Sequence, residues 1–316
     1  MNTKTIKILI TEPMAEEGVS LLKKHPNFEV QIGLNMPSED LLTTIPAYDC
    51  LLVRSQTKVD ADLLKAGINL KLVGRAGVGI DNIDINQAKA RGIAVINTPS
   101  GNSISAAELA FGLMLSLARK IPFAHNHVRQ GLWDRGSFKG IELFQKTLSI
   151  IGFGNVGQQL AKRALAFDMK VIAYDPVIRP STVMPYIQDA SLEEAFKAGD
   201  FISLHCPLND CTKSIINQQN IALMKKGVML INTARGELID DEALLSGLNE
   251  GPIGFAALDV FSKEPPSPKD PLLHHPKIVL TPHLGASTSE AQQRVSYQLA
   301  LDTVAFFSGQ ELRRIV

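Results

Sequence analysis

Short apolar runs rich in β-branched residues alternate with helical patterns along most of this chain. In the first hundred residues the runs are KILIT, FEVQI, CLLVRS, LKLVGRAG and IAVIN, and helices are expected near 14–24, 38–44, 59–66 and 84–91. Strand-length runs separated by helices of about ten residues are typical of βαβ units, in which helices cover both faces of a parallel sheet. The sequence therefore predicts an α/β fold of doubly wound parallel sheets.

The alternation is interrupted once, after Pro99. One long apolar helix is expected from Ser100 to Lys120, with Pro122 ending it, and an irregular polar stretch, HNHVRQGLWDRGSFKGIEL, follows. A second alternation starts at KTLSIIGFG and supplies six strands, and a closing helix is expected near 287–308. Because 316 residues is about twice the usual length of a domain, two α/β domains are expected. We predict a discontinuous domain of residues 1–97 and 287–316 and a continuous domain of residues 98–286.

The composition argues against several classes of function. Thirty-two Lys and Arg balance thirty-two Asp and Glu and the isoelectric point is about 7.1, whereas proteins that coat nucleic acid or an anionic membrane usually carry a basic excess. The three cysteines form no CxxC pair, so neither a disulfide framework nor a metal site is predicted. The N-terminus lacks the pattern of a signal peptide, and no apolar stretch approaches the roughly 20 residues that span a bilayer. A soluble, cytoplasmic protein without nucleic-acid or membrane partners is expected.

A glycine-rich loop opens the second alternation. Gly152-Phe-Gly154-Asn-Val-Gly157 follows the run TLSII and precedes the helical pattern GQQLAKRALAF. In this context the first glycine permits a tight turn, the second lets the backbone approach a pyrophosphate, and the third lets helix and strand pack closely. Asp175 ends the next strand, 18 residues after Gly157, where its carboxylate could accept hydrogen bonds from an adenosine ribose. The loop indicates a Rossmann domain, although an ordinary βα turn is the alternative, and NAD is favoured over NADP because no Arg directly follows Asp175.

Three polar residues follow later strands of the same domain, at the sheet edge where α/β proteins bind ligands. They are Arg235, Glu264 and His283. Hydride transfer between a 2-hydroxy acid and a nicotinamide needs a cation for the carboxylate, an acid/base for the hydroxyl proton and a group that holds this acid/base near its working pKa. Arg235, His283 and Glu264 could serve in that order. Each also has an ordinary interpretation, as a turn-capping arginine, a surface histidine and a solvated loop glutamate.

At these residues the chain resembles the D-isomer-specific 2-hydroxyacid dehydrogenases, and most closely the branch that oxidises D-3-phosphoglycerate. The resemblance covers nearly the whole chain and is carried by VRSQTKV (53–59), GRAGVGIDNID (74–84), NTPSGNSISAAELA (97–110), GFGNVG (152–157), INTARGELID (231–240), ALDVFSKEPP (257–266) and PHLGAST (282–288). It implies that a flavodoxin-like substrate domain accompanies the Rossmann NAD-binding domain.

The resemblance also implies residue roles. His283 would be the general base for alcohol oxidation and the acid for ketone reduction, Glu264 would favour the protonated imidazole, and Arg235 would hold the substrate carboxylate. Implied cofactor contacts are Gly152, Gly154, Asn155, Val156, Gly157, Asp175, Cys206, Thr233, Asp259 and Val78. Implied substrate contacts besides Arg235 and His283 are Arg54, Ser55, Gly77, Val78, Gly79, Asn102 and Arg135. Related enzymes often carry Thr where this chain has Val78 and Cys206, so only backbone contacts are carried over at those two positions.

Arg54 and Arg135 are the candidates for holding a phosphate at the far end of the substrate, because a partly desolvated dianion needs at least two cationic partners. Arg135 lies in the stretch 122–140, which is long for a connection within a compact domain and is expected to expose Trp133 and Phe138. In the phosphoglycerate dehydrogenases the matching arm crosses to the partner subunit. We therefore expect a homodimer or higher homo-oligomer in which Arg135 of one subunit reaches the phosphate held by Arg54 of the other.

The function expected is NAD-dependent oxidation of D-3-phosphoglycerate, the first step of phosphorylated serine biosynthesis. A glyoxylate or hydroxypyruvate reductase of the same family would share every catalytic residue and is the first alternative. A nucleotide-sensing, protein-binding module resembling the C-terminal-binding corepressors is the second, but such proteins usually carry extra segments for their partners. This chain ends at Val316, soon after its closing helix, so neither such segments nor a C-terminal regulatory domain is expected.

Overall fold

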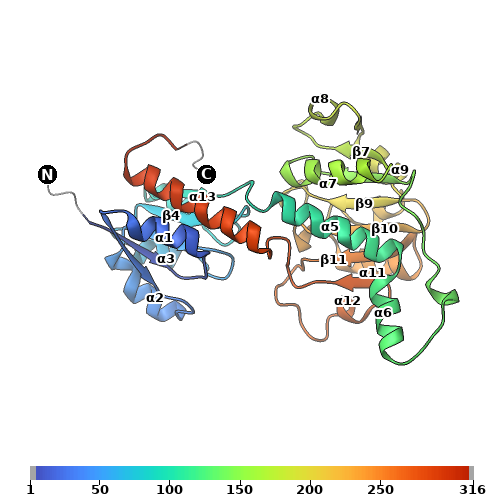
Figure 1. Cartoon of the computed structure of the whole chain (residues 1–316), viewed down its shortest axis with the longest axis horizontal. Coiled ribbons are helices and arrows are strands. Elements are labelled where there is room, and N and C mark those ends of the chain that lie inside the picture. Colours follow the sequence, from blue (N-terminus) through green and yellow to red (C-terminus); the bar gives the residue numbers. More distant parts are fainter. Residues whose placement is uncertain (1–4, 313–316) are drawn as a thin grey trace. The chain divides into compact units, whose positions relative to one another are not determined.

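The computed structural model describes residues 5–312 and divides into two compact units (Figure 1). The discontinuous unit comprises Met1–Asn102 and Ala286–Val316, and the continuous unit comprises Ser103–Gly285. The first boundary lies five residues beyond the one predicted, because the Thr98 amide donates to Gly77 O at 2.9 Å and Arg294 donates to Gly101 O at 2.9 Å. These bonds attach the segment 98–102 to the discontinuous unit.

The discontinuous unit is a five-stranded parallel sheet in the order β2-β1-β3-β4-β5, the flavodoxin-like order. Its strands are β1 (Ile6–Ile10), β2 (Phe28–Ile32), β3 (Cys50–Val53), β4 (Leu72–Arg75) and β5 (Ala94–Asn97). One face is covered by α1 (Glu16–Lys24) and α13 (Ser289–Phe307), and the other by α2 (Ser38–Thr44), η1 (Ile45–Ala47), α3 (Ala61–Ala66) and α4 (Ile85–Ala90). Successive side chains of a strand point to opposite faces, so Ile8 and Ile10 pack under α13 while Leu9 joins the core on the other face.

The continuous unit is a seven-stranded parallel sheet in the order β12-β11-β10-β9-β6-β7-β8. Its strands are β6 (Thr147–Ile151), β7 (Lys170–Tyr174), β8 (Gln188–Asp189), β9 (Phe201–Leu204), β10 (Val228–Asn232), β11 (Ile253–Leu258) and β12 (Ile278–Leu280). The prediction of six strands missed β8, because two polar residues are too short to show an apolar run. The strand order reverses at β6, which has β9 on one side and β7 on the other. Ligands of open α/β sheets bind at the carboxyl end of such a strand.

Helices cover both faces of this sheet. They are α5 (Ser103–Ala118) and α7 (Asn155–Ala166) on one face, and α9 (Leu192–Ala198), α10 (Gln218–Ile221), α11 (Asp241–Asn249) and α12 (Pro271–His274) on the other. The remaining elements are α6 (Ile121–Arg129), α8 (Pro180–Val183), η2 (Gly136–Phe138) and η3 (Gly236–Leu238). No helix within residues 5–312 is both long enough and apolar enough to cross a bilayer.

The segment after α5 differs from the prediction. Lys120 takes a left-handed conformation, with φ of 53°, and Pro122 lies in the first turn of α6 instead of ending a helix before an irregular stretch. Proline is accepted there because first-turn amides have no intrahelical acceptor. Trp133 is 81% exposed, as expected, but Phe138 is half-buried because its ring packs edge-on against His127, with centroids 5.1 Å apart.

Candidate active site

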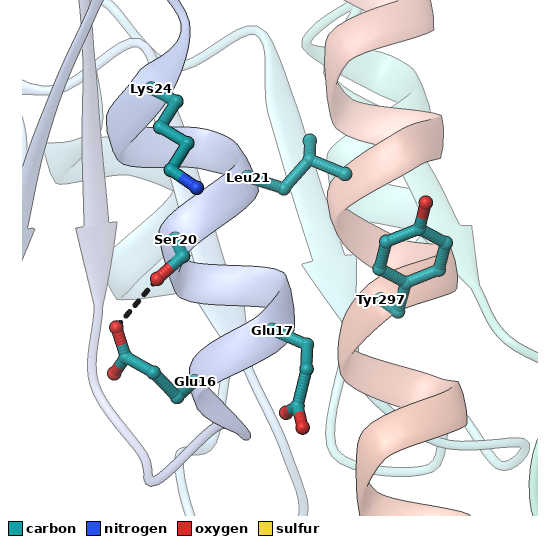
Figure 2. Close-up of a pocket in the computed structure, with 6 residues that line it drawn as sticks. All are labelled: Glu16, Glu17, Ser20, Leu21, Lys24 and Tyr297. Atoms are coloured by element: carbon teal, nitrogen blue, oxygen red, sulfur yellow. Dashed lines mark hydrogen bonds between the residues drawn. The ribbon is translucent and has the colours of Figure 1, made fainter.

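A groove of about 480 Å³ lies between α1 and α13 (Figure 2). In the groove Ser20 donates to Glu16, one helical turn before it, at 2.6 Å. The lining consists of Glu16, Glu17, Ser20, Leu21, Lys24 and Tyr297, which are surface residues of the two helices. None of the predicted site residues lines this groove.

The three glycines of the loop after β6 have different surroundings. Gly152 has φ of 96°, and a Cβ there would lie 2.5 Å from the Cys206 amide nitrogen. A Cβ on Gly157 would lie 2.4 Å from Gly152 O, so this glycine permits close packing of helix on strand. Gly154 is the N-cap of α7 without a side-chain cap, and a Cβ there would meet nothing within 4 Å. The loop therefore leaves open space before the N-terminus of a twelve-residue helix, which suits the pyrophosphate of a dinucleotide.

Asp175 follows β7 and is tied to the glycine loop. Its Oδ2 accepts from the Phe153 amide at 2.8 Å, and its Oδ1 accepts from the amides of Val177 and Ile178 at 2.9 and 2.8 Å. A carboxylate offers about four acceptor positions, so these three donors leave room for a ribose hydroxyl.

The end of β9 carries two groups that are neutral at neutral pH. Burial raises the pKa of the Cys206 thiol to about 11, and the charge of Asp175 adds to this effect. Burial lowers the pKa of His205 to about 4, and its Nε2 is 2.8 Å from the Ser203 hydroxyl. Cys206 is therefore a thiol and His205 an uncharged imidazole at the edge where the cofactor is expected. Sequence reasoning had selected Cys206 but neither His205 nor Ser203.

His283 and Glu264 form a hydrogen-bonded pair. His283 Nδ1 lies 2.7 Å from Glu264 Oε2, and the two side chains are 44% and 39% exposed. Partial burial opposes ionisation of Glu264, but the hydrogen bond and charge of His283, the Phe261 amide and the charge of Arg235 together lower the pKa of Glu264. An ionised Glu264 that accepts from Nδ1 leaves Nε2 of His283 to exchange a proton with a substrate.

A mostly apolar pocket of about 420 Å³ adjoins this pair. Its lining residues are Phe261, Glu264, Pro265, Pro266, Leu273, Leu280, Thr281, Pro282 and His283. The acid/base pair therefore borders an open apolar hollow and remains accessible to a substrate.

Asp259, at the end of β11, holds the turn that carries His283. Its fully buried Oδ1 accepts from the Thr281 hydroxyl at 2.6 Å and the Leu284 amide at 2.7 Å, and its Oδ2 accepts from the Gly285 amide at 2.9 Å. The His283 amide donates to Asp259 O at 2.8 Å. His283 has φ of 55°, a conformation that a non-glycine residue keeps only where its surroundings fix it. Asp259 was predicted as a cofactor contact, and the structure gives it this supporting network.

Arg235 lies in the turn after β10, and Asn232 shapes that turn. The Asn232 side chain donates to Arg235 O at 2.7 Å and accepts from the Ala234 amide at 3.0 Å. A Cβ on Gly236 would lie 1.9 Å from the Phe261 carbonyl carbon, so only glycine lets this turn pack against the segment that leads to Glu264. This close approach is consistent with the charge of Arg235 acting on Glu264.

Thr233 contributes a buried polar atom to the same strand end. Its Oγ1 has no hydrogen-bond partner within residues 5–312. A buried hydroxyl without a partner is costly, and a polar group of a bound cofactor would remove that cost. The Thr233 hydroxyl and the open space at Gly154 both fit a bound dinucleotide.

The predicted substrate contacts of the discontinuous unit follow β3, β4 and β5. Arg54 and Ser55 come directly after β3, and Arg54 Nη1 donates to Pro13 O at 3.3 Å. The loop after β4 is fixed where Asn97 donates to Val78 O at 2.6 Å. Asn102 Oδ1 is buried and has no hydrogen-bond partner in the described part of the chain. These residues gather along one edge of the five-stranded sheet.

The other predicted contacts take varied positions. Gly77 and Gly79 lie in the loop after β4, where Gly77 O accepts from the Thr98 amide at 2.9 Å. Arg135 is exposed and lies at the N-cap of η2 in the continuous unit. Asn155 and Val156 form the first turn of α7, after Gly154. Within residues 5–312 no three His, Cys, Asp or Glu side chains are grouped as a metal site would require.

Comparison with known proteins assigns the chain to a family. The model of the D-isomer specific 2-hydroxyacid dehydrogenase, NAD binding domain, matches residues 111–285. The chain belongs to this family. The D-2-hydroxyacid dehydrogenases are NAD-dependent oxidoreductases, so the α/β fold, the enzyme class and NAD as the cofactor, all predicted from the sequence, are confirmed.

Individual relatives agree on the family but carry two different names. A hydroxypyruvate reductase of Thermotoga maritima is 48% identical over 295 residues, which cover 93% of this chain and 95% of that protein. A D-3-phosphoglycerate dehydrogenase of Archaeoglobus fulgidus is 44% identical over 312 residues, which cover 98% of this chain and 59% of that protein. The crystal structure of the TT0316 protein from Thermus thermophilus superposes with a TM-score of 0.90 at 32% identity, covering 98% of this chain and 100% of that one. This chain thus spans 52–59% of the length of the phosphoglycerate dehydrogenases that it matches.

Proposed function

We propose that this protein oxidises D-3-phosphoglycerate to 3-phosphohydroxypyruvate with NAD, the first step of phosphorylated serine biosynthesis. The reaction type rests on the 2.7 Å bond between His283 and Glu264, which prepares an imidazole for proton transfer. The choice of substrate is supported by Arg54 and Arg135, two cations available for a phosphate, and by the many relatives named for this activity. The cytoplasm is the proposed location.

The residues would divide the chemistry as follows. Arg235 holds the substrate carboxylate and polarises the reacting oxygen, and Nε2 of His283 takes the C2 hydroxyl proton while the C2–H bond breaks. Glu264 stabilises the imidazolium that forms. NAD, when bound, accepts the hydride, so that the alcohol becomes a ketone and one proton is left on His283.

The cofactor would be held at the carboxyl ends of β6, β7, β9, β10 and β11. The pyrophosphate would lie against Gly154 and the first turn of α7, and Asp175 would accept from the adenosine ribose. Cys206 would contact the cofactor through its backbone, and Thr233 would donate to or accept from the nicotinamide end. The remaining proposed cofactor contacts are Gly152, Asn155, Val156, Gly157, Asp259 and Val78.

The second candidate function is hydroxypyruvate reduction. It is favoured by the Thermotoga relative, which matches this chain over 95% of its own length. NADH formation measured with D-3-phosphoglycerate and with D-glycerate separates the two, with L-isomers and the His283→Ala variant as controls. Two charge-assisted contacts of roughly 1.5–3 kcal/mol each would give D-3-phosphoglycerate at least about a hundredfold higher kcat/KM. A preference for D-glycerate would establish the reductase, and no turnover of either acid would favour a nucleotide-sensing module.

We also propose that the protein is a homodimer or a higher homo-oligomer. The helix α6 has no buried residue, and several apolar side chains of the stretch that it begins are exposed. These are Ile121, Val128, Leu132, Trp133, Ile141 and Phe144. Exposed aromatic residues are typical of interface anchors. In the proposed oligomer a second copy of this chain would cover these side chains.

In this dimer Arg135 of one subunit would reach the phosphate held by Arg54 of the other. Arg135→Ala should raise KM for D-3-phosphoglycerate about ten- to a hundredfold, the equivalent of one charge-assisted contact, and should spare acids without a phosphate. Subunits carrying Arg54→Ala and Arg135→Ala should recover one intact site of two when they are mixed. A mixture no better than either variant alone would show that the two arginines do not share a site.

A further inference from the structure

The loop Arg54–Thr57, which follows β3, is held by a single buried carboxylate. Glu12, two residues after the end of β1, is 5% exposed and accepts from all four backbone amides of this loop. Its Oε1 accepts from Arg54 at 2.8 Å and Thr57 at 2.9 Å. Its Oε2 accepts from Ser55 at 3.1 Å and Gln56 at 3.0 Å. One side chain thereby fixes the amide side of the entire loop.

The carbonyl side of the same loop is held by two further side chains. Arg75 Nε donates to Arg54 O at 3.0 Å. Asn82 Nδ2 donates to Arg54 O at 2.9 Å and to Thr57 O at 2.7 Å. The hydroxyls of Thr57 and Thr11 are also hydrogen-bonded, at 2.9 Å. The backbone of the loop is therefore held from both sides by the protein itself. The Ser55 side chain and the Arg54 guanidinium, which also donates to Pro13 O at 3.3 Å, remain to meet a ligand.

From this arrangement we propose that Glu12 is a positioning residue that sets the affinity for substrate by fixing the loop that presents Arg54 and Ser55. The inference rests on the proposed function, in which these two side chains bind the substrate. Because Glu12 occupies all four amides, the loop does not offer its N–H groups to the substrate's anionic end. Recognition at this edge then depends on side chains, whose placement Glu12 controls.

The charge state of Glu12 is consistent with this role. Burial alone would raise its pKa, but the amides of Thr57, Gln56 and Arg54 and the Thr57 hydroxyl lower it, and the net pKa lies below the ordinary value of 4.5. Glu12 is therefore ionised at the pH at which such an enzyme works. A glutamine cannot replace it, because its single oxygen serves only one pair of amides and its NH₂ group faces the other pair.

The test compares Glu12→Gln with a matched control at the opposite end of the same sheet. Asp49 immediately precedes β3, is 4% exposed, accepts from the Lys7 amide at 3.1 Å and pairs with Lys71 at 3.2 Å. Glu12→Gln should raise KM for the 2-hydroxy acid at least about tenfold, while KM for NAD stays within about twofold and kcat within about threefold. Asp49→Asn should lower the thermal midpoint without changing either KM.

A second variant keeps the inference testable if Glu12→Gln does not fold. Asn82→Ala removes one of the two donors on the carbonyl side of the loop and should raise KM for the acid in the same selective way. Arg54→Ala and Ser55→Ala test the proposed function separately. If neither changes KM for any acid, the loop does not bind substrate and both proposals fail. If they raise KM but Glu12→Gln and Asn82→Ala do not, or if Glu12→Gln raises KM for NAD equally, the role of Glu12 alone is overturned.

Discussion

Replacing Asp259 with Asn should impair catalysis far more than stability. The buried carboxylate accepts from Thr281, Leu284 and Gly285, and this network holds the turn that carries His283. An asparagine oxygen can keep the first two donors, but its NH₂ group would then face the Gly285 amide. One charge-assisted hydrogen bond is lost and its donor stays buried, at a cost of roughly 1.5–3 kcal/mol. If the lost bond lets His283 move from its catalytic position, the activation free energy rises by this amount and kcat decreases about ten- to a hundredfold.

The effect on stability is smaller because the charge of Asp259 is itself unfavourable. Burial raises the pKa of Asp259 despite the opposing hydrogen bonds of Thr281, Leu284 and Gly285 and the charge of His283. When a carboxyl has a higher pKa in the folded state than in the unfolded state, the protein loses stability as pH rises through these two pKa values. At neutral pH the ionisation of Asp259 therefore disfavours folding. A neutral amide removes that contribution and partly offsets the lost bond. We expect the free energy of unfolding to change by less than about 1.5 kcal/mol.

Asp200→Asn is the matched control for this experiment. Asp200 precedes β9 at the amino ends of the same sheet, where it accepts from the Thr147 amide at 2.8 Å and from Lys225 Nζ at 3.1 Å. This variant should lose stability in urea titrations and keep its kcat. Steady-state NADH formation and urea midpoints measured on both variants give the comparison. A kcat for Asp259→Asn within twofold of the unaltered enzyme would refute the positioning role of Asp259.

Four further predictions follow from the same geometry. His283→Ala should lower kcat by on the order of 10²–10⁴, whereas Glu264→Gln should do less and should move the acidic limb of the kcat/KM profile for alcohol oxidation to lower pH, because the imidazolium loses an anionic partner; an unchanged profile would assign Glu264 a structural role. The carboxylate of Asp175 should repel a 2′-phosphate, so NAD should be preferred over NADP by about one to two orders of magnitude in kcat/KM, or roughly 1.4–3 kcal/mol, and equal values would contradict this. Burial lowers the pKa of His205 from 6.5 to about 4, so the unfolded chain takes up a proton at higher pH than the folded chain. The free energy of unfolding should therefore decrease by up to about 3 kcal/mol as pH falls from 6.5 to about 4. Urea midpoints of a His205→Gln variant should lack that part of the pH dependence. The exposed Cys211 should react with iodoacetamide in the native protein while the two buried cysteines, whose thiol pKa values are raised by burial, should react only after unfolding; rapid labelling of a second cysteine would oppose this.

The order of the elements and the dinucleotide loop were determined by the sequence alone. Short apolar runs such as TLSII are local signals, and β6 lies where that run predicts it. The glycine spacing is local as well, because the positive φ of Gly152 and the close approach of Gly157 to Gly152 O both arise within one βα turn. The polar strand-end residues Arg235, Glu264 and His283 could be selected because parallel strands bring their carboxyl ends to one edge of a sheet.

The tertiary structure decided the features that local patterns do not encode. The two-residue β8 has no run of its own and exists because β7 offers it an edge to pair with. Pro122 permits either a helix end or a helix start, and only the left-handed Lys120 before it selects the start.

The same holds for the two carboxylates that support the site. Glu12 is 42–45 residues from the amides it accepts from, and Asp259 is 22–26 residues from its donors. No pattern in the sequence selected Glu12, and Asp259 was selected only as an implied cofactor contact, not as the acceptor that holds the turn of His283. Their roles depend on which strands become neighbours, because a buried carboxylate is stable only where folding brings enough donors around it.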